Sequence, residues 1–330
     1  MITVIGEALI DLVSVRGGDP VAHPGGSPTN VAVGLGRLGA PVRLITRYGT
    51  DPHGELLAAH LAASTVEVVP QSRSAGRTSV ARADLDASGA ATYTFDIVWE
   101  LPESVGVPTG SRCVHTGSIA ATLAPGADLV RRVLAAEHAK AEAVVSYDPN
   151  CRPSLMGDPG PVRERIESLV ALSDVVKVSD EDLEWLYPAR DFAEVADAWL
   201  GLGPSLVVVT RGAAGSYGVC SAGRATAPAR AVRVVDTVGA GDAYTAGLLD
   251  ALRRRDLLNP AGIRRLDPAT LGTLLTDASV VAALTCSRAG ANPPTAAELS
   301  AYRREHGLAC GAGRHQGSSS NPWPGSAGTR

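Results

Sequence analysis

Short apolar runs alternate with longer amphipathic segments over most of the 330 residues of the chain. The short runs are rich in β-branched residues, as buried strands are, and lie at 3–6, 42–46, 112–115, 143–147, 175–178 and 206–209. The longer segments carry the helical period and lie near 29–38, 53–63, 127–139, 161–172, 180–187, 191–200, 240–255 and 269–284. This alternation predicts an α/β fold in which helices cover both faces of a parallel sheet, with ligands beyond the carboxyl ends of the strands.

Two regions, 11–25 and 76–98, interrupt the alternation with short extended pieces and no intervening helix. Within the second region, the runs 78–85 and 91–95 flank Asp86-Ala87-Ser88-Gly89, which is typical of a hairpin connection. A sheet of this size needs the main domain to cover one of its faces. We therefore expect a small β lid attached to the main sheet.

The most informative turn of the chain follows the apolar run 231–235, which predicts the end of a strand, and precedes a predicted helix. Gly239 and Gly241 flank Ala240, and Asp242 comes immediately after them. Glycines let the backbone approach a ligand closely, and the free N–H groups at a helix start bind anions. An acid beside such a site is costly unless it has a chemical role. One role fits, which is a base that takes a proton from a hydroxyl group while the N–H groups hold a phosphoryl group.

Composition narrows the class of protein. With 45% hydrophobic and 19% charged residues, the chain suits one large globular domain over 1–310, followed by a Gly-, Ser- and Pro-rich segment, 311–330, that is typical of a disordered tail. The net charge of −4 and the lack of a long basic run argue against a nucleic-acid surface. Five single cysteines without a C-x-x-C pair suit a reducing cytoplasm. No apolar run approaches 18 residues, so we expect no membrane span.

The glycines at 34–39 match the G-x-G-x-x-G pattern of dinucleotide-binding proteins. That pattern requires the glycines in a turn directly after a strand. Here they follow 28–33, which reads as the first part of a helix, so we expect them inside the helix and at its end. Small residues on one helix face favour close helix packing, and NAD binding is disfavoured.

Four further patches contain polar residues near expected strand ends, and each also has a purely structural explanation. The patch 25–30 can be a capped helix start, with Ser27 or Thr29 as the cap, and Asp11 can be a turn residue. The other three patches lie at 147–153, 177–183 and 210–215. The first can be a proline-stiffened turn that places Asn150 and Arg152 above a strand end. The second can be a helix cap beside Lys177, and the third a hairpin turn.

Taken together, the patches resemble the PfkB, or ribokinase-like, family of carbohydrate kinases. The patch 25–30 resembles the first signature of the family and 236–249 its long second signature, and the order and spacing of the patches agree over 1–305. The resemblance implies a three-layer α/β/α sandwich with a mostly parallel sheet and a small β lid over the sugar site. It also implies ATP and Mg²⁺ as cofactors, a potassium-like cation near Asp236 and 288–292, and a homodimer that forms through the lid.

The resemblance also implies a role for individual residues. Asp242 would be the base, and the N–H groups of Gly239, Ala240 and Gly241 would form an anion hole for the phosphoryl group. The residues implied in sugar binding are Asp11, Gly25, Gly26, Asn30 and Arg152. Those implied in ATP binding are Asn150, Lys177, Thr210, Gly212, Gly215 and Ser279. The chain departs from common family patterns at Ser279, at Pro294 and at Ser179-x-x-Asp182, which stands where members carry N-x-x-E.

The choice of sugar depends on shorter resemblances. The D-x-N-x-R element at 148–152 occurs in both fructokinase-like and 2-keto-3-deoxygluconate-kinase-like members, whereas 78–86, 115–119 and 288–293 resemble the fructokinase branch. The expected lid strand 93–100 carries acids and no Arg, which disfavours a sugar acid. We therefore predict an ATP-dependent kinase acting on fructose. The alternatives are a 2-keto-3-deoxygluconate kinase, a ribokinase-type activity, and a non-catalytic sugar or nucleotide sensor on the same fold.

Overall fold

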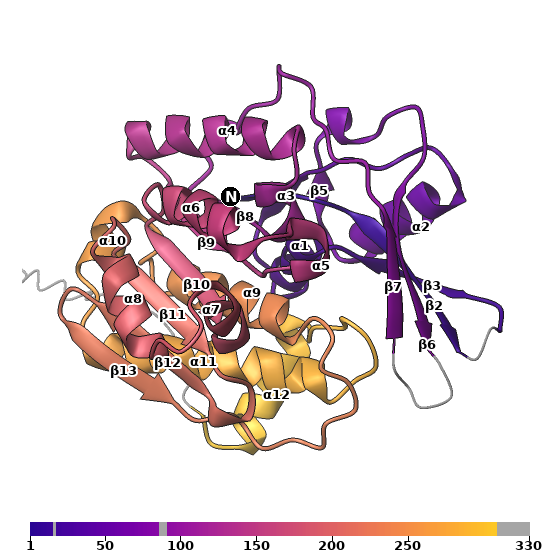
Figure 1. Cartoon of the computed structure of the whole chain (residues 1–330). Coiled ribbons are helices and arrows are strands. Elements are labelled where there is room, and N and C mark those ends of the chain that lie inside the picture. Colours follow the sequence, from indigo (N-terminus) through magenta and orange to yellow (C-terminus); the bar gives the residue numbers. More distant parts are fainter. Residues whose placement is uncertain (16–17, 86–90, 309–330) are drawn as a thin grey trace, which may run out of the picture.

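The computed structural model describes residues 1–15, 18–85 and 91–308 (Figure 1). The predicted hairpin connection at 86–89 and the predicted tail at 311–330 lie outside the described residues.

The main sheet has nine strands in the order β13-β12-β11-β10-β9-β8-β1-β4-β5 (Figure 1). Their bounds are β1 Ile2–Ile5, β4 Val42–Ile45, β5 Glu67–Val68, β8 Cys113–Gly117, β9 Val144–Asp148, β10 Val175–Ser179, β11 Leu206–Thr210, β12 Ser216–Cys220 and β13 Gly223–Ala227. From β5 to β11 all neighbours pair in parallel, and β12 and β13 add an antiparallel edge. All six predicted strands therefore form, each within two residues of its expected bounds.

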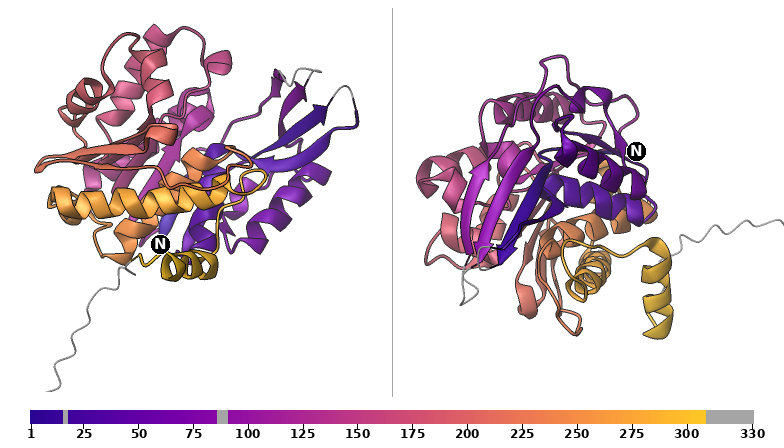
Figure 2. Two further views of the ribbon diagram at one scale, coloured as in Figure 1. Left: turned by 90° about the horizontal axis from the view of Figure 1, so that it is seen from below. Right: turned by 90° about the vertical axis from the view of Figure 1, so that its right-hand side faces the viewer.

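Helices cover both faces of this sheet (Figures 1 and 2). One face packs against α1 Ser27–Arg37, α9 Ala240–Arg254 and α11 Pro268–Cys286. The other packs against α3 Ser118–Thr122, α4 Gly126–Lys140, α6 Pro159–Val170, α7 Asp180–Leu186 and α8 Phe192–Leu200. Successive side chains of β11 alternate between the two cores, since Leu206 and Val208 join the first and Val207 and Val209 the second. This double burial explains why the strands are continuous apolar runs.

The remaining helices are α2 Pro52–Ala63, α5 Pro153–Met156, α10 Pro260–Arg264 and α12 Ala296–Glu305, with short 3₁₀ turns η1 Pro70–Ser72 and η2 Gly212–Ala214. Helix α11 is long and apolar enough to cross a membrane by length and composition alone. It instead packs against α9, β12 and β13, with Leu271, Leu274 and Leu275 buried. Its composition is that of a core helix.

A second sheet has the order β3-β2-β6-β7 and stands beside the main sheet, at the right of Figure 1. Its strands are β2 Leu9–Val15, β3 Val21–Gly25, β6 Ser79–Leu85 and β7 Ala91–Asp96. Ile10 and Leu12 pack toward Leu57 of α2, whereas Leu9 and Ala81 pack with Ile119 of α3. Both faces are thus anchored to the main domain, which confirms the predicted small sheet.

The predicted strand end at 231–235 is wrong. The structure assigns no strand there, and Val234 and Val235 are 61% and 57% exposed. The N–H groups of Val235 and Asp236 both donate to the carbonyl oxygen of Cys286, at the end of α11. The segment has the composition of a strand, but its backbone bonds to a helix end in place of a neighbouring strand.

The glycines at 34 and 36 lie inside α1, as predicted. A Cβ added at Gly34 would lie 2.7 Å from the Cβ of Ala246 in α9, so the two helices approach too closely for any larger residue. The dinucleotide interpretation of this pattern is excluded by its position, and close helix packing explains the glycines.

Candidate active site

The turn before α9 requires glycine for two reasons. Gly239 has a φ of 74°, in the left-handed region, and a Cβ there would lie 2.6 Å from the Cβ of Ala291. Helix α9 starts at the next residue, Ala240, whose N–H group is 3.2 Å from the carbonyl oxygen of Thr237. The Ala240 N–H is thus engaged within the turn, whereas the N–H groups of Gly239 and Gly241 have no hydrogen-bond partner among the described residues and are available to an anion.

Asp242 lies in the first turn of α9 and is only 6% exposed. Its Oδ1 accepts a hydrogen bond from the Ser27 hydroxyl at 2.7 Å, and its Oδ2 accepts one from the Asn30 amide at 2.8 Å. Burial raises the pKa of the Asp242 carboxyl, although these two hydrogen bonds counteract part of the effect. Asp242 is therefore a fixed carboxylate with increased basicity, which suits a general base.

The predicted cap of α1 by Ser27 or Thr29 is wrong. The N-cap residue is Gly26, with a φ of 100°, and no side chain caps the helix. The Ser27 hydroxyl instead donates to Asp242, and the Thr29 hydroxyl donates to the carbonyl oxygen of Glu7 at 2.8 Å. Both hydroxyl groups therefore bond to residues distant in the sequence, and neither bonds to the free N–H groups at the start of α1.

Asn150 connects the base to Arg152. Its side-chain amide donates to the Ser27 hydroxyl at 2.7 Å, and its oxygen accepts from the Arg152 guanidinium at 2.7 Å. The Asn150 Nδ2 atom also lies 3.4 Å from Asp242 Oδ1. The structure thus brings the patches around 25–30, 148–152 and 236–242 together, and it places Asn150 beside the base.

A buried ion pair lies beneath the turn. The Lys177 ammonium is 3.0 Å from Asp148 Oδ2, at the carboxyl ends of the adjacent strands β10 and β9. Burial alone would lower the pKa of Lys177, but the neighbouring carboxylates, Asp148 foremost, raise it overall. A Cβ at Gly241 would lie 3.0 Å from the ammonium nitrogen, so glycine lets this positive charge approach the turn. Asp148 Oδ1 is buried and has no hydrogen-bond partner among the described residues.

The second sheet contributes Asp11, which lies directly opposite His23 across the β2–β3 pair. A Cβ at Gly25 would overlap the Asp11 carboxylate, so glycine is needed at this position to make room for it. Burial raises the pKa of Asp11 to about 6, while the charge of Arg152 lowers it. Asp11 therefore faces the group formed by Arg152 and Asp242.

Glu7 is a site-proximal residue that the sequence reasoning missed. It is buried where the chain passes from β1 to β2, its Oε2 accepts from the Ala120 N–H at 3.0 Å, and its backbone carbonyl accepts from Thr29. Burial raises the pKa of Glu7 to about 7. An acid within the apolar run from Ile5 to Ile10 was the available signal.

The candidate nucleotide residues form a separate group. Thr210, Gly212 and Gly215 lie in the turn from β11 to β12, which confirms the predicted hairpin. A Cβ at Gly215 would overlap the carbonyl oxygen of Ala227, so this turn packs against the chain leading to 231–235. The exposed apolar segment 231–235, which the sequence predicted as a strand, follows this contact along the chain and precedes the turn before α9.

Ser279 and Asp236 lie outside that hairpin turn. Ser279 is buried in α11, and Tyr244 of the neighbouring α9 donates its hydroxyl hydrogen bond to Ser216, at the start of β12, at 2.8 Å. Asp236 accepts hydrogen bonds from the N–H groups of Val238 at 3.0 Å and Gly290 at 2.8 Å, which lower its pKa. The Asp236 carboxylate thus connects the turn before α9 with the segment after α11.

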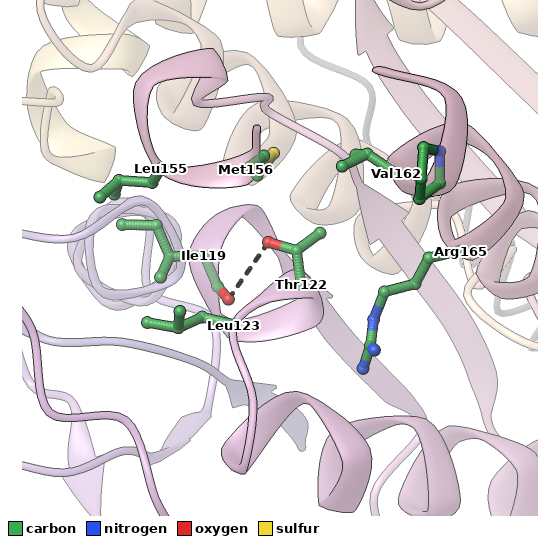
Figure 3. A pocket seen from close by; sticks show the side chains of 8 residues that line it. Ile119, Thr122, Leu123, Leu155, Met156, Val162 and Arg165 are labelled. Atoms are coloured by element: carbon green, nitrogen blue, oxygen red, sulfur yellow. Dashed lines mark hydrogen bonds between the residues drawn. The ribbon is translucent and has the colours of Figure 1, made fainter. Parts of the chain in front are cut away.

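An apolar pocket of about 280 Å³ lies between α3, α5 and α6 (Figure 3). Leu155 and Met156, which follow the Arg152 loop, form one wall. Its polar side chains are engaged within the fold, because the Thr122 hydroxyl interacts with the Ile119 carbonyl and Arg165 binds Ala121 and Asp128. The pocket supplies no free acid–base group, in contrast to the cluster around Asp242.

Residues 1–298 match the pfkB family carbohydrate kinase description. A fructokinase of Rhizobium leguminosarum bv. trifolii is 36% identical over 283 residues, which cover 82% of this chain and 85% of the relative. A crystal structure of fructokinase with bound ATP from Xylella fastidiosa has a TM-score of 0.80 at 26% identity, covering 93% of this chain and 98% of that one. Fructokinase from Vibrio cholerae O395, bound to fructose, ADP and a calcium ion, has a TM-score of 0.75 at 27% identity and covers 92% and 99%.

Proposed function

This chain belongs to the pfkB family of carbohydrate kinases, and from that membership we propose that it transfers the γ-phosphoryl group of ATP to a hydroxyl group of fructose. Its activity is that of an ATP-dependent sugar kinase. The observation that carries the residue assignments is the convergence of Ser27 and Asn30 on buried Asp242, beside the N-terminus of α9. A carboxylate fixed beside an anion-binding turn is what phosphoryl transfer to a hydroxyl requires.

In the proposed mechanism, Asp242 accepts the proton of the sugar hydroxyl as the hydroxyl oxygen forms a bond to the γ-phosphorus. The bond between that phosphorus and the β–γ bridging oxygen breaks, and ADP leaves with its electron pair. The N–H groups of Gly239 and Gly241 stabilise the negative charge on the transferring group, and that of Ala240 would join them by giving up its bond to the Thr237 carbonyl oxygen. The ammonium of Lys177 adds positive charge from beneath the turn.

The proposed ligand contacts divide between two sides of Asp242. On the sugar side we assign Asp11, Gly25, Gly26, Asn30 and Arg152. On the nucleotide side we assign Lys177, Thr210, Gly212 and Gly215, with the exposed apolar segment 231–235 as a surface for the purine. Asn150 lies among Ser27, Arg152 and Asp242, so we assign it to orienting the base. Ser279 is buried in α11, so on the nucleotide side we assign it a supporting position and no direct contact with ATP.

The acid of the second sheet that bears on the choice of sugar is Asp11, in place of the Asp96 expected from the sequence. Phe95 packs on the side of Leu9 and Ala81, so alternation places Asp96 on the opposite face, where it pairs with Arg77. The acid that faces the sugar position is Asp11. A carboxylate there repels a sugar acid, which supports fructose over 2-keto-3-deoxygluconate.

The residues present fit a divalent cation of the kind that accompanies ATP. Mg²⁺ is bound through one or two carboxylates, water and substrate phosphates, and Asp148 Oδ1 is a buried anionic oxygen with no partner among the described residues. Asp182 is already bonded to the N–H groups of Cys151 and Ser179. The part of the chain that is described contains no cluster of three or more His, Cys, Asp or Glu side chains for a metal, so nucleotide and water would supply most ligands. When bound, the cation neutralises phosphate charge. A potassium-like ion near Asp236 and 288–292 remains part of the proposal.

The proposal also includes a homodimer that pairs the second sheets of two chains. Val13 and Val21 lie opposite each other in the β2–β3 pair, and Val21 is 57% exposed. Light scattering on the purified protein would test the dimer.

The four cysteines in the described residues are free thiols, which suits the proposed cytoplasmic location.

A coupled assay of ADP release tests the substrate. We expect the highest kcat/KM with fructose, compared with ribose, 2-keto-3-deoxygluconate, tagatose 6-phosphate and adenosine. A higher value for another sugar would reassign the substrate. No ADP release with any sugar would favour a non-catalytic sensor.

Replacing the base tests the mechanism. The D242N variant should lose about 10³-fold in kcat, because removing a general base costs roughly 10²–10⁴-fold. ATP affinity, measured by calorimetry, should change little. The matched control is D256N, which removes an exposed carboxylate paired with Arg112 and should leave kcat unchanged. Near-normal turnover by D242N would refute the assignment.

A further inference from the structure

One face of α1 connects both sides of the phosphoryl-transfer site. Asn30, Gly34 and Arg37 are spaced at i, i+4 and i+7, so they lie along the same face of the helix. Asn30 binds the Asp242 carboxylate at the start of this face, and Gly34 packs closely against α9 in the middle. Arg37 occupies the last turn, about 10 Å further along the axis at 1.5 Å per residue.

The Arg37 guanidinium holds the segment that follows α11. It donates to the carbonyl oxygen of Pro293 at 2.9 Å and to the side-chain oxygen of Asn292. Its Nε–H donates to the Ser64 hydroxyl at 3.3 Å, which restrains the plane of the guanidinium group. Burial and the charge of Arg288 lower the pKa of Arg37, while the Glu298 carboxylate raises it. Surface packing alone gives no reason for a cation here.

The segment that Arg37 contacts, residues 290–293, packs against the turn before α9 and forms one wall beside it. The N–H group of Gly290 donates to Asp236 Oδ2 at 2.8 Å, and Ala291 lies against Gly239 so closely that no Cβ fits between them. Moving 290–293 would therefore release Asp236 and change the position of Gly239. Arg37 is the side chain through which α1 restrains this wall.

We propose that Arg37 is a positioning residue for phosphoryl transfer. By fixing segment 290–293 to α1, it holds the N–H groups of the turn before α9 at a constant distance from the Asp242 carboxylate. Asn30 and Arg37 hold Asp242 and this wall from one rigid helix, so the hydroxyl side and the phosphoryl side keep a constant separation. The inference rests on the proposed role of the N–H groups of Gly239, Ala240 and Gly241. Arg37 itself contacts no reacting atom.

The test compares R37M with R37K and with R43M. Arg43 is a matched control, since it is a partly exposed arginine of β4 that pairs with Glu67 of β5. For each protein, ADP calorimetry counts the competent sites, and kcat is expressed per site. We expect R37M to lose about 10–100-fold in kcat, because small misplacements of aligned groups cost up to about 10²-fold. The KM for the best sugar should stay within about 2-fold, because misalignment acts on the transferring group more than on sugar binding.

A second readout separates positioning from folding. The complex of ADP, Mg²⁺, aluminium fluoride and the best sugar imitates the transferring phosphoryl group, so R37M should weaken it by the same factor as kcat while ADP alone binds normally. R37K should recover part of both losses, because an ammonium can still donate to Pro293. R43M should behave as wild type in every measurement.

Three outcomes would overturn the inference. The first is a normal kcat per site in R37M. The second is an equal decrease in affinity for ADP and for the aluminium fluoride complex. The third is a loss of total activity that comes only from a smaller number of competent sites. The D242N result distinguishes these failures from failure of the proposed function. If D242N is inactive and R37M is normal, only the positioning role of Arg37 is wrong, whereas an active D242N removes the proposed mechanism on which it rests.

Discussion

Among the acids near the site whose pKa values are raised, Asp242, Asp11 and Glu7 have surroundings that give them different tasks. Asp242 is bonded by two donors that orient it toward the α9 turn. Asp11 lies in the second sheet, where the Arg152 charge acts on it. Glu7 is 2% exposed, and its oxygen accepts a hydrogen bond from the Ala120 N–H group. Burial raises the pKa of Glu7 more than its hydrogen bonds and the Arg152 charge lower it, so the ionisation of Glu7 opposes folding.

We expect E7Q to stabilise the protein at alkaline pH. The folded-state pKa of Glu7 is about 7, above the usual value of 4.5, so its stabilising contribution is complete below pH 4.5 and is lost as pH rises through 7. Glutamine keeps an acceptor for the Ala120 N–H group and carries no charge. At pH 8 the variant should exceed wild type by up to about 3 kcal/mol in free energy of unfolding, with little difference at pH 5.

Urea denaturation at the two pH values measures this difference. The control is E142Q, at an exposed position, which should show the same stability as wild type at both pH values. A difference between E7Q and wild type that does not change with pH would show that ionisation of Glu7 is not its cause.

Among the contacts between elements, that of α1 with α9 bears on both packing and catalysis. Gly34 leaves room for Ala246, and the same pair of helices presents Asn30 to Asp242. Separating the helices would therefore weaken both the packing and the orientation of the base. Stability and catalysis depend on one contact here.

Two glycine-to-alanine changes in helices should have opposite effects. In G34A the new methyl group would lie 2.7 Å from Ala246, so the helices must separate, at a cost of about 1–3 kcal/mol in stability and with a lower kcat. In G272A, within α11, the nearest atom lies at 3.7 Å, and alanine should stabilise the helix by about 0.5–1 kcal/mol with kcat unchanged. Thermal denaturation and steady-state assays measure both. Equal effects of the two changes would contradict the packing argument.

Elements buried on both faces were predictable from the sequence, because such strands must be continuous apolar runs, as β11 is. The run 231–235 has the same composition, but whether a neighbouring strand exists is a tertiary property. The Ser27 hydroxyl was misassigned for a similar reason, since its partner Asp242 is 215 residues away. Glu7 was missed because its pKa depends on burial, which local sequence does not contain. Signatures located the active-site patches, whereas the contacts among them required the fold.

At the scale of the whole molecule, α9 joins the active site to an ion-pair cluster at its other end. Asp250 binds Arg253 and Arg254 within the helix. Asp277 of α11 lies 2.8 Å from Arg255 and 2.7 Å from Arg303 of α12. The cluster thus fastens α9, α11 and α12 together, far along α9 from Asp242, so it should govern stability without acting on the chemistry.

We expect D277N to lower the free energy of unfolding by about 3 kcal/mol, because removing one partner of a buried pair leaves charges uncompensated. Arg303 is buried and would lose its carboxylate, and Arg255 would lose one as well. The control is D197N, which breaks an exposed pair with Arg224 and should cost at most about 1 kcal/mol. Chemical denaturation gives both values, and sugar KM measured on folded protein should match wild type in each. If D277N costs no more than D197N, the three helices are held by apolar packing alone, and the cluster has no part in fastening α12 to the domain.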